Sequence, residues 1–156
     1  MDVFKYEPID LEGPAFRLLR LVKGRESDIE CELFQAWLYE GSAIIPYEAL
    51  SYTWGGTEMT KYIKINGRGL SVTENLYWAL RHLRSQVTDR ILWIDAVCIN
   101  QGNEKERGHQ VQQMGNIYSR AERVIIWLGL ATLATDVIMD SLRQLQEECF
   151  KHAYKD

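Results

Sequence analysis

The stretch from Ile91 to Gly129 constrains the fold of this 156-residue chain more than any other. It reads ILWIDAVCINQ, then a polar turn, an amphipathic segment that ends in NIYSRA, and VIIWLG. A strand, a loop, a helix and a second strand within about 40 residues have the size and order of a parallel β-α-β crossover. Open parallel sheets bind ligands at the carboxyl ends of their strands. Asp95, Asn100 and Gln101 fall there, so this unit predicts both the fold class and the place of a site.

Two hairpins are predicted before this unit. Residues 16–22 and 29–34 are β-rich and flank a turn-forming stretch, which indicates an N-terminal hairpin. Residues 62–65 and 70–72 flank Asn66-Gly67, the strongest short-range hairpin signal. We expect this second hairpin to be a surface insertion that extends an edge of the sheet, with neither strand central. An aromatic strand, residues 47–56, lies between the two hairpins.

Hydrophobic spacing predicts three helices. In the first, Thr73 precedes a row formed by Leu76, Leu80 and Leu83. The second begins with Asn103 and Glu106, which resemble a capping box; the residues expected on its buried face are Val111, Met114, Tyr118 and Ala121. The third follows Thr135, and its apolar row contains Ile138, Leu142, Leu145 and Cys149.

The order from residue 47 onward is therefore βαβαβα with an inserted hairpin. We expect an α/β fold in which helices flank a small parallel sheet, with an antiparallel N-terminal hairpin. The chain is interpreted as a single domain, 1–156, with an N-terminal β extension (1–46), a motif core (47–129) and a C-terminal helix (130–156). Its abrupt polar end fits a domain cut from a longer protein.

Charge and composition exclude several function classes. The net charge is −4 and the pI about 5.4, so no basic field is available for nucleic acid or an anionic membrane. The longest apolar runs fall far short of the ~20 residues that span a bilayer, and the acidic N-terminus does not fit a secretory signal. Three widely spaced cysteines suit neither disulfides nor zinc, and no histidine has a partner at ligand spacing. Cys98 is interpreted as a small core residue. We expect a cytoplasmic protein without a metal or a cofactor.

Several blocks of the chain resemble one family. They are YEALSYTWGG at residues 47–56, IKINGRGLSV at 63–72, LWIDAVCINQ at 92–101, Glu106-Arg107, and VIIWLG at 124–129. In this order and spacing they resemble the fungal heterokaryon-incompatibility (HET) domain. The resemblance implies a module that triggers programmed cell death when non-self is detected in fused fungal cells, usually at the N-terminus of a larger protein.

The HET domain is itself remotely similar to Toll/interleukin-receptor (TIR) domains, which share the βαβαβα order. Some of these cleave NAD at the nicotinamide-ribose bond, whereas others are adaptors that assemble without catalysis. The resemblance thus leaves two alternatives: a glycohydrolase for which NAD or a related nucleotide is the substrate, or a non-catalytic module that acts by self-association. TIR enzymes carry their glutamate on the helix after the third strand, but residues 130–141 contain no glutamate. That catalytic residue does not carry over.

Asp95 and Glu106 are the remaining catalytic candidates. Asp95 follows the apolar residues 91–94, where a carboxylate must be solvated or hydrogen-bonded. It either binds ligand hydroxyls or ties down the following loop through backbone N–H groups. Glu106 either takes part in catalysis or caps its own helix. Arg107, expected on the buried row of that helix, either pairs with Asp95 or receives a phosphate.

The remaining candidates are ligand-binding residues. Asn100 and Gln101 stand beside a helix N-terminus, which suits an anion or a sugar hydroxyl, or they bond only within the loop. Trp54 offers a ring for stacking and Gly55 lets backbone approach a ligand, unless both belong to a buried aromatic turn. No G-x-G-x-x-G motif occurs, so dehydrogenase-style NAD binding is not supported. We predict that one cleft is lined by Tyr52, Trp54, Asp95, Asn100, Gln101 and Arg107.

Overall fold

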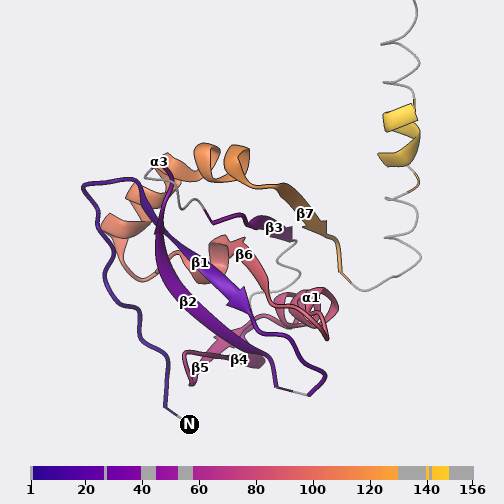
Figure 1. The fold of residues 1–156 in the computed structure, drawn as a ribbon, viewed down its shortest axis with the longest axis horizontal. Coiled ribbons are helices and arrows are strands. Elements are labelled where there is room, and N and C mark those ends of the chain that lie inside the picture. The colour runs from indigo at the N-terminus through magenta and orange to yellow at the C-terminus, as the bar shows by residue number, and fades with distance from the viewer. Residues whose placement is uncertain are drawn as a thin grey trace, which may run out of the picture.

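The chain folds around one seven-stranded sheet with the strand order β5-β4-β2-β1-β6-β3-β7 (Figure 1). The computed structural model describes residues 2–26, 28–39, 45–52, 58–129, 140 and 142–147. The predicted fold class is confirmed, because a mixed α/β sheet carries helices and both predicted hairpins are present. The hairpins are not separate additions, since they pair with the parallel strands to form a single mixed sheet.

One half of the sheet contains the hairpins. Strands β1 (Ala15–Leu21) and β2 (Glu30–Trp37) pair antiparallel, as do β4 (Lys61–Ile65) and β5 (Arg68–Val72). The turn between β4 and β5 uses the expected positive φ angles, 52° at Asn66 and 81° at Gly67.

The expectation that the second hairpin only extends an edge is wrong for β4. Lys64 pairs with Glu30 of β2 on one side and with Gly69 of β5 on the other, so β4 lies inside the sheet and β5 forms the edge. The pairing of β2 with β4 is parallel and joins segments far apart in the chain. No local turn signal could reveal it.

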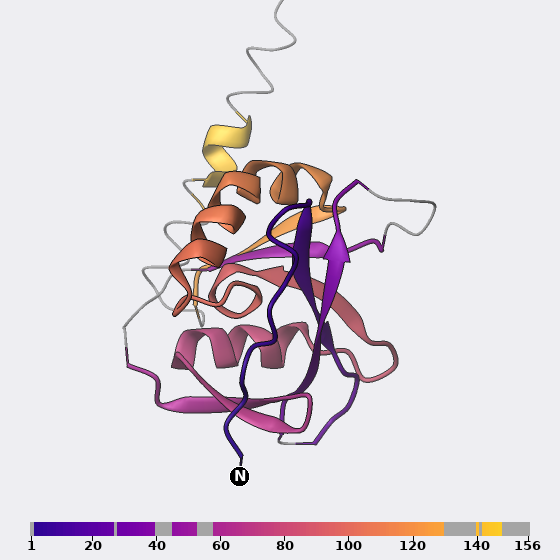
Figure 2. The same cartoon turned by 90° about the vertical axis from the view of Figure 1, so that its left-hand side faces the viewer.

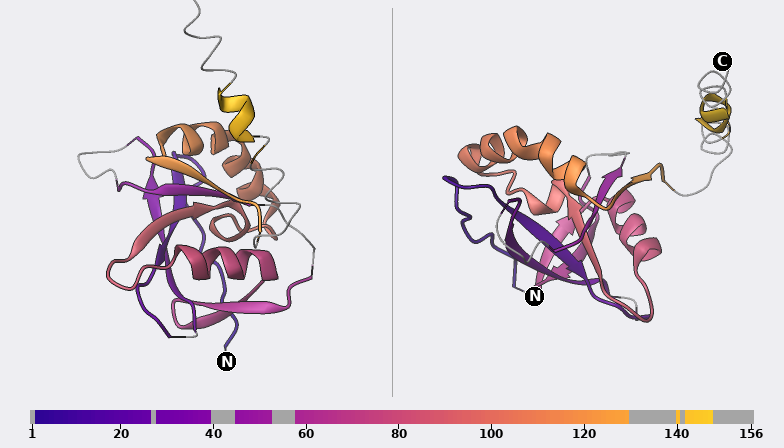
Figure 3. Two further views of the ribbon diagram at one scale, coloured as in Figure 1. Left: turned by 90° about the vertical axis from the view of Figure 1, so that its right-hand side faces the viewer. Right: turned by 45° about the horizontal axis from the view of Figure 1, so that its top comes forward.

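The other half of the sheet is parallel and carries the helices. Strand β3 (Glu48–Tyr52) pairs with β6 (Arg90–Ile94) on one side and with β7 (Arg123–Trp127) on the other, and β1 joins β6 antiparallel. The helices are α1 (Glu74–Leu83), the single turn α2 (Asp95–Cys98) and α3 (Glu104–Arg120). Figures 2 and 3 show the parallel strands between α3 and α1.

Strand register explains why α1 and α3 cover opposite faces. Trp93 pairs with Ala49 and its ring contacts Tyr118 of α3 at 5.3 Å, whereas Trp127 pairs with Tyr52 and bonds to Asn75 of α1. Side chains alternate between faces along a strand, so Ala49 and Tyr52, three residues apart, point to opposite sides. The core between these layers is apolar; its largest fully buried side chains include Trp93, Leu18, Leu19, Leu50 and Leu80.

The helix predictions are confirmed in part. Thr73 caps α1 and Leu76 and Leu80 are buried. On α3, Met114, Tyr118 and Ala121 pack against the core, but Val111 is exposed and the buried row instead contains Glu106, Gln110 and Ile117. In the third expected helix, residues 140 and 142–147 are helical, with Leu142 and Leu145 exposed, and its other residues lie outside the described ones.

Candidate functional site

The carboxyl ends of the three parallel strands meet at one edge of the sheet. Tyr52 ends β3, Asp95 follows β6 directly, and Trp127 ends β7 and pairs with Tyr52 in register. The start of α1 closes this edge, because the indole N–H of Trp127 donates to the Asn75 side-chain oxygen at 3.0 Å. The location predicted from the β-α-β unit is therefore where these side chains gather.

Asp95 is a half-buried carboxylate at the first position of α2. Burial raises its pKa above the ordinary 3.8, and hydrogen bonds with its own backbone and that of Ala96 offset part of the rise. Both interpretations of Asp95, as a tie for the loop and as a ligand-binding group, thus have a physical basis. The carboxylate bonds to the backbone of the following turn, but these hydrogen bonds do not fully offset the effect of burial on its pKa.

Two phenols stand within the electrostatic reach of Asp95. The pKa of Tyr52 is raised to about 12, mainly by burial and then by the charge of Asp95, while a hydrogen bond with Thr73 acts in the opposite direction. The pKa of Tyr118 is raised by burial and then by Asp95, against a hydrogen bond with Ser51. Both phenols therefore remain protonated at neutral pH, which makes them potential hydrogen-bond donors beside a carboxylate.

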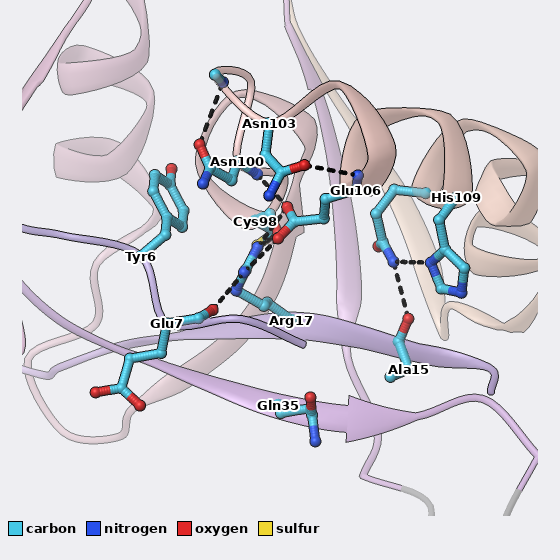
Figure 4. A network of polar contacts seen from close by, with 12 residues as sticks. Tyr6, Glu7, Ala15, Arg17, Gln35, Cys98, Asn100, Asn103, Glu106 and His109 are labelled. Atoms are coloured by element: carbon cyan, nitrogen blue, oxygen red, sulfur yellow. Dashed lines mark hydrogen bonds and ion pairs between the residues drawn. The ribbon is translucent and has the colours of Figure 1, made fainter. Parts of the chain in front are cut away.

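Glu106 belongs to a different network, centred on Arg17 of β1 (Figure 4). The two side chains are 2% and 4% exposed, and the guanidinium binds both carboxylate oxygens, at 2.6 and 2.7 Å. One of those oxygens also accepts the backbone N–H of Asn100 at 2.5 Å. Arg17 donates further to the carbonyls of Cys98 (3.2 Å) and Glu7 (2.7 Å). Glu106 therefore joins β1, the N-terminal segment and the loop before α3, and the three hydrogen bonds that it accepts use most of its acceptor capacity.

The loop after α2 is held by its own hydrogen bonds. The Asn100 side-chain oxygen accepts from the N–H of Gly102 at 3.2 Å, and the Gln101 side-chain amide donates to the carbonyl of Asp95 at 3.0 Å. Asn103 caps α3 by accepting the N–H of Glu106 at 3.1 Å. Loop-internal bonding, one of the two interpretations of Asn100 and Gln101, is thus present, and Gln101 ties the loop back to the position of Asp95.

Arg107 does not lie where the helical row predicted. It is exposed on α3, and its guanidinium donates to the carbonyl of Gln101 at 3.5 Å. The structure describes both Arg107 and Asp95, and contains no ion pair between them. The predicted row is wrong in the first turns of the helix, because Glu106 and Gln110 are buried where Arg107 and Val111 were expected, whereas Met114, Tyr118 and Ala121 do pack against the core. Trp54 and Gly55 lie outside the described residues.

Sequence reasoning missed Arg17 and Tyr118 as members of these networks. Arg17 and Arg20 stand in one apolar strand, FRLLRL, and nothing local distinguishes the buried arginine from the exposed one. Tyr118 was assigned to the core only. Within the described ranges, no three His, Cys, Asp or Glu side chains lie close enough to hold a metal ion. No helix in the described part of the chain is long and apolar enough to span a membrane.

Comparison with known proteins identifies the class. The family model "Heterokaryon incompatibility protein (HET)" matches residues 47–156, more than half of the chain. The chain therefore belongs to the heterokaryon incompatibility family.

A curated relative agrees with this assignment. The chain is 35% identical over 164 aligned positions to heterokaryon incompatibility protein 6, OR allele, of Neurospora crassa. The alignment covers 94% of this chain but only 24% of that relative, so the chain spans about a quarter of its length. No solved structure matches.

Proposed function

We propose that this chain is the signalling domain of a protein that triggers programmed cell death on recognition of fungal non-self, and that it acts by cleaving NAD or a related nucleotide at the glycosidic bond. Family membership and the similarity to a heterokaryon incompatibility protein support the biological role. The single observation that carries the chemistry is Asp95, a half-buried carboxylate at the carboxyl end of β6 beside two protonated phenols.

The reaction breaks the bond between C1′ of the ribose and the nicotinamide nitrogen. The bonding electrons leave with nicotinamide, water adds to C1′, and one proton is released. Positive charge develops on the ribosyl ring in the transition state, and a carboxylate held in a site of low water content stabilises it. Asp95 takes this role. Tyr52 and Tyr118 approach it from opposite faces of the sheet, so each hydroxyl would bond to a different side of the sugar. Glu106 takes no part, because Arg17 and Asn100 already occupy its oxygens.

The test is nicotinamide release from millimolar NAD by the purified chain, with its association state measured in the same sample. We expect Asp95→Asn to reduce release by about a hundredfold or more, the usual effect of removing one transition-state-stabilising group. Asp89→Asn is the matched control, since Asp89 lies just before β6 and its carboxylate accepts the backbone N–H of Lys23 on the loop after β1. Undiminished release by a folded Asp95→Asn variant, or none by an associated wild-type chain, would refute the chemistry.

A second candidate is a non-catalytic module that acts by self-assembly, and strand β7 favours it. This strand pairs with β3 on one side and has no strand neighbour among the described residues on the other. Val124 and Ile126 are 46% and 67% exposed on it. An apolar edge strand is a template for pairing with a second copy.

Sedimentation over a range of concentrations tests this candidate. Ile126→Lys should abolish association, whereas Val87→Lys should leave it unchanged, because Val87 is an apolar residue at least as exposed as Ile126 but lies in a loop. Equal association of the two variants would exclude β7 as the contact.

A further inference from the structure

A pocket of about 570 Å³ lies along the outer edge of β2, and its lining includes Arg17 and Glu7 of the Glu106 network but neither Asp95 nor the two phenols near it. Strand β4 pairs in register with β2 at Glu30 and Cys31, and beyond this point no described strand continues along that side of β2. Asn66 substitutes for a strand at one point, accepting the Leu33 N–H at 3.1 Å and donating to the Leu33 carbonyl at 3.4 Å.

The N-terminal segment forms the opposite wall of the pocket. The Phe4 N–H donates to the carbonyl of Gly69 at 2.9 Å, which ties this segment to β5. Further along, the N–H of Asp10 donates to the Gln35 side-chain oxygen at 3.1 Å, which leaves the amide NH₂ of Gln35 as a donor. In Figure 4, Glu7 lies on the N-terminal segment and Gln35 on β2. The volume lies within the range of small-molecule sites, about 300–1,000 Å³.

The charges of the lining favour an anion. Lys5 and Arg68 line the pocket and form no ion pair with any described residue. The charge of Arg17 is already balanced by Glu106, and the one carboxylate of the lining is that of Glu7. In a chain with a net charge of −4, this is a local excess of positive charge that concentrates anions.

Aromatic rings add a surface for a planar group. Phe4 and Phe34 are half-buried and both line the pocket. Phe4 packs edge-on against Tyr6 at 5.0 Å, which fixes the orientation of its ring. Stacking on such rings accepts any base, because every base has a π face.

We propose that this pocket binds a nucleoside monophosphate, with its phosphate between Lys5 and Arg68 and its base against Phe4 and Phe34. The site is independent of the proposed NAD cleavage, because Asp95 does not line it. Arg17 connects the pocket to Glu106 and the Asn100 backbone, so a ligand here contacts the network that holds the loop before α3.

The experiment is a titration of the purified chain with AMP, in which binding is monitored by calorimetry and by the shifts of the amide NMR signals. Adenosine and inorganic phosphate serve as partial probes. Three charge reversals are compared: Lys5→Glu and Arg68→Glu in the pocket, and Arg25→Glu as the control. Arg25 is exposed, has no ion pair among the described residues and does not line the pocket, so it matches the change in net charge.

We expect AMP binding to be saturable and to shift the amide signals of the N-terminal segment and β2. Arg68→Glu or Lys5→Glu should weaken the affinity for AMP at least about tenfold, the size expected for the loss of a charge-assisted hydrogen bond. Arg25→Glu should leave the affinity unchanged. Asp95→Asn should bind AMP as the wild type does, which separates this site from the proposed activity. Absence of saturable binding, equal loss in all three reversals, or phosphate binding as tight as AMP would each overturn the proposal.

Discussion

Replacing Arg17 by methionine should remove a large part of the stability of this domain. Arg17 and Glu106 are almost fully buried and joined through both carboxylate oxygens. Arg17→Met leaves the Glu106 charge with the Asn100 N–H as its one remaining partner among the described residues. It also removes a donor from the carbonyls of Cys98 and Glu7. Removing one partner of a buried pair costs about 3–5 kcal/mol. Small domains have about 5–15 kcal/mol in total.

The same hairpin supplies the control. Arg20 pairs with Glu32 at 2.9 Å, with side chains 44% and 54% exposed, and such pairs are worth less than about 1 kcal/mol. With a urea m value of about 2 kcal/mol/M, Arg17→Met should lower the unfolding midpoint by about 2 M and Arg20→Met by less than about 0.5 M. Urea unfolding followed by tryptophan fluorescence measures both.

A double variant separates the buried charge from the loss of packing. Arg17→Met with Glu106→Leu removes both charges, so it should be more stable than Arg17→Met alone. Recovery should be incomplete, because the Asn100 N–H and two carbonyls still lack their partners. If Arg17→Met cost no more than Arg20→Met, or if the double variant were the less stable one, the argument from the buried pair would be refuted.

Three further outcomes are expected. Burial raises the pKa of Asp95 in the folded chain. The stability that the protonated carboxyl contributes is therefore present below its ordinary pKa of 3.8 and is lost as the pH rises through the raised pKa. The Asp95→Asn variant should melt no lower than the wild type at neutral pH, and the difference in melting temperature should vanish in acid. Burial also raises the pKa of Cys31 and Cys98 to about 12, so peptide mapping after iodoacetamide treatment of the folded chain should find neither labelled, and labelling of both would contradict their burial. Gly67 has φ 81°, so Gly67→Ala should lower the free energy of unfolding in urea by about 1–2 kcal/mol. Gly108 lies in α3 with open space around it, so Gly108→Ala should raise that free energy by about 0.5–1 kcal/mol. Equal effects of the two substitutions would contradict the turn geometry.

Local patterns were sufficient for most elements of the fold. Asn66-Gly67 predicted the β4–β5 turn, and the apolar run before Asp95 predicted the buried strand β6, because these signals lie within a few residues of what they specify. The position of β4 within the sheet was not predictable in this way. It depends on parallel pairing of Lys64 with Glu30, which no turn or period encodes.

The site shows the same limit at the level of side chains. The location of Asp95 at a strand end followed from the β-α-β order. The pairing of Glu106 could not be predicted from the sequence, because its partner Arg17 is 89 residues away and Arg20 on the same strand has the same side-chain chemistry. Helical spacing placed Arg107 on the buried row, yet in the first turns of α3 the buried side chains are those of Glu106 and Gln110, and Arg107 is exposed.

Burial separates the two candidate carboxylates into different roles. Glu106 is the more deeply buried, but a bidentate guanidinium and a backbone N–H compensate its charge, and a compensated group has little capacity left for a ligand. Asp95 is less buried, yet burial outweighs its hydrogen bonds and its pKa rises. A carboxylate whose burial is not fully compensated, at the carboxyl end of a parallel strand, gains most from a ligand that brings positive charge or hydroxyl donors. This difference is the reason why the proposed cleavage assigns the substrate to Asp95 and not to Glu106.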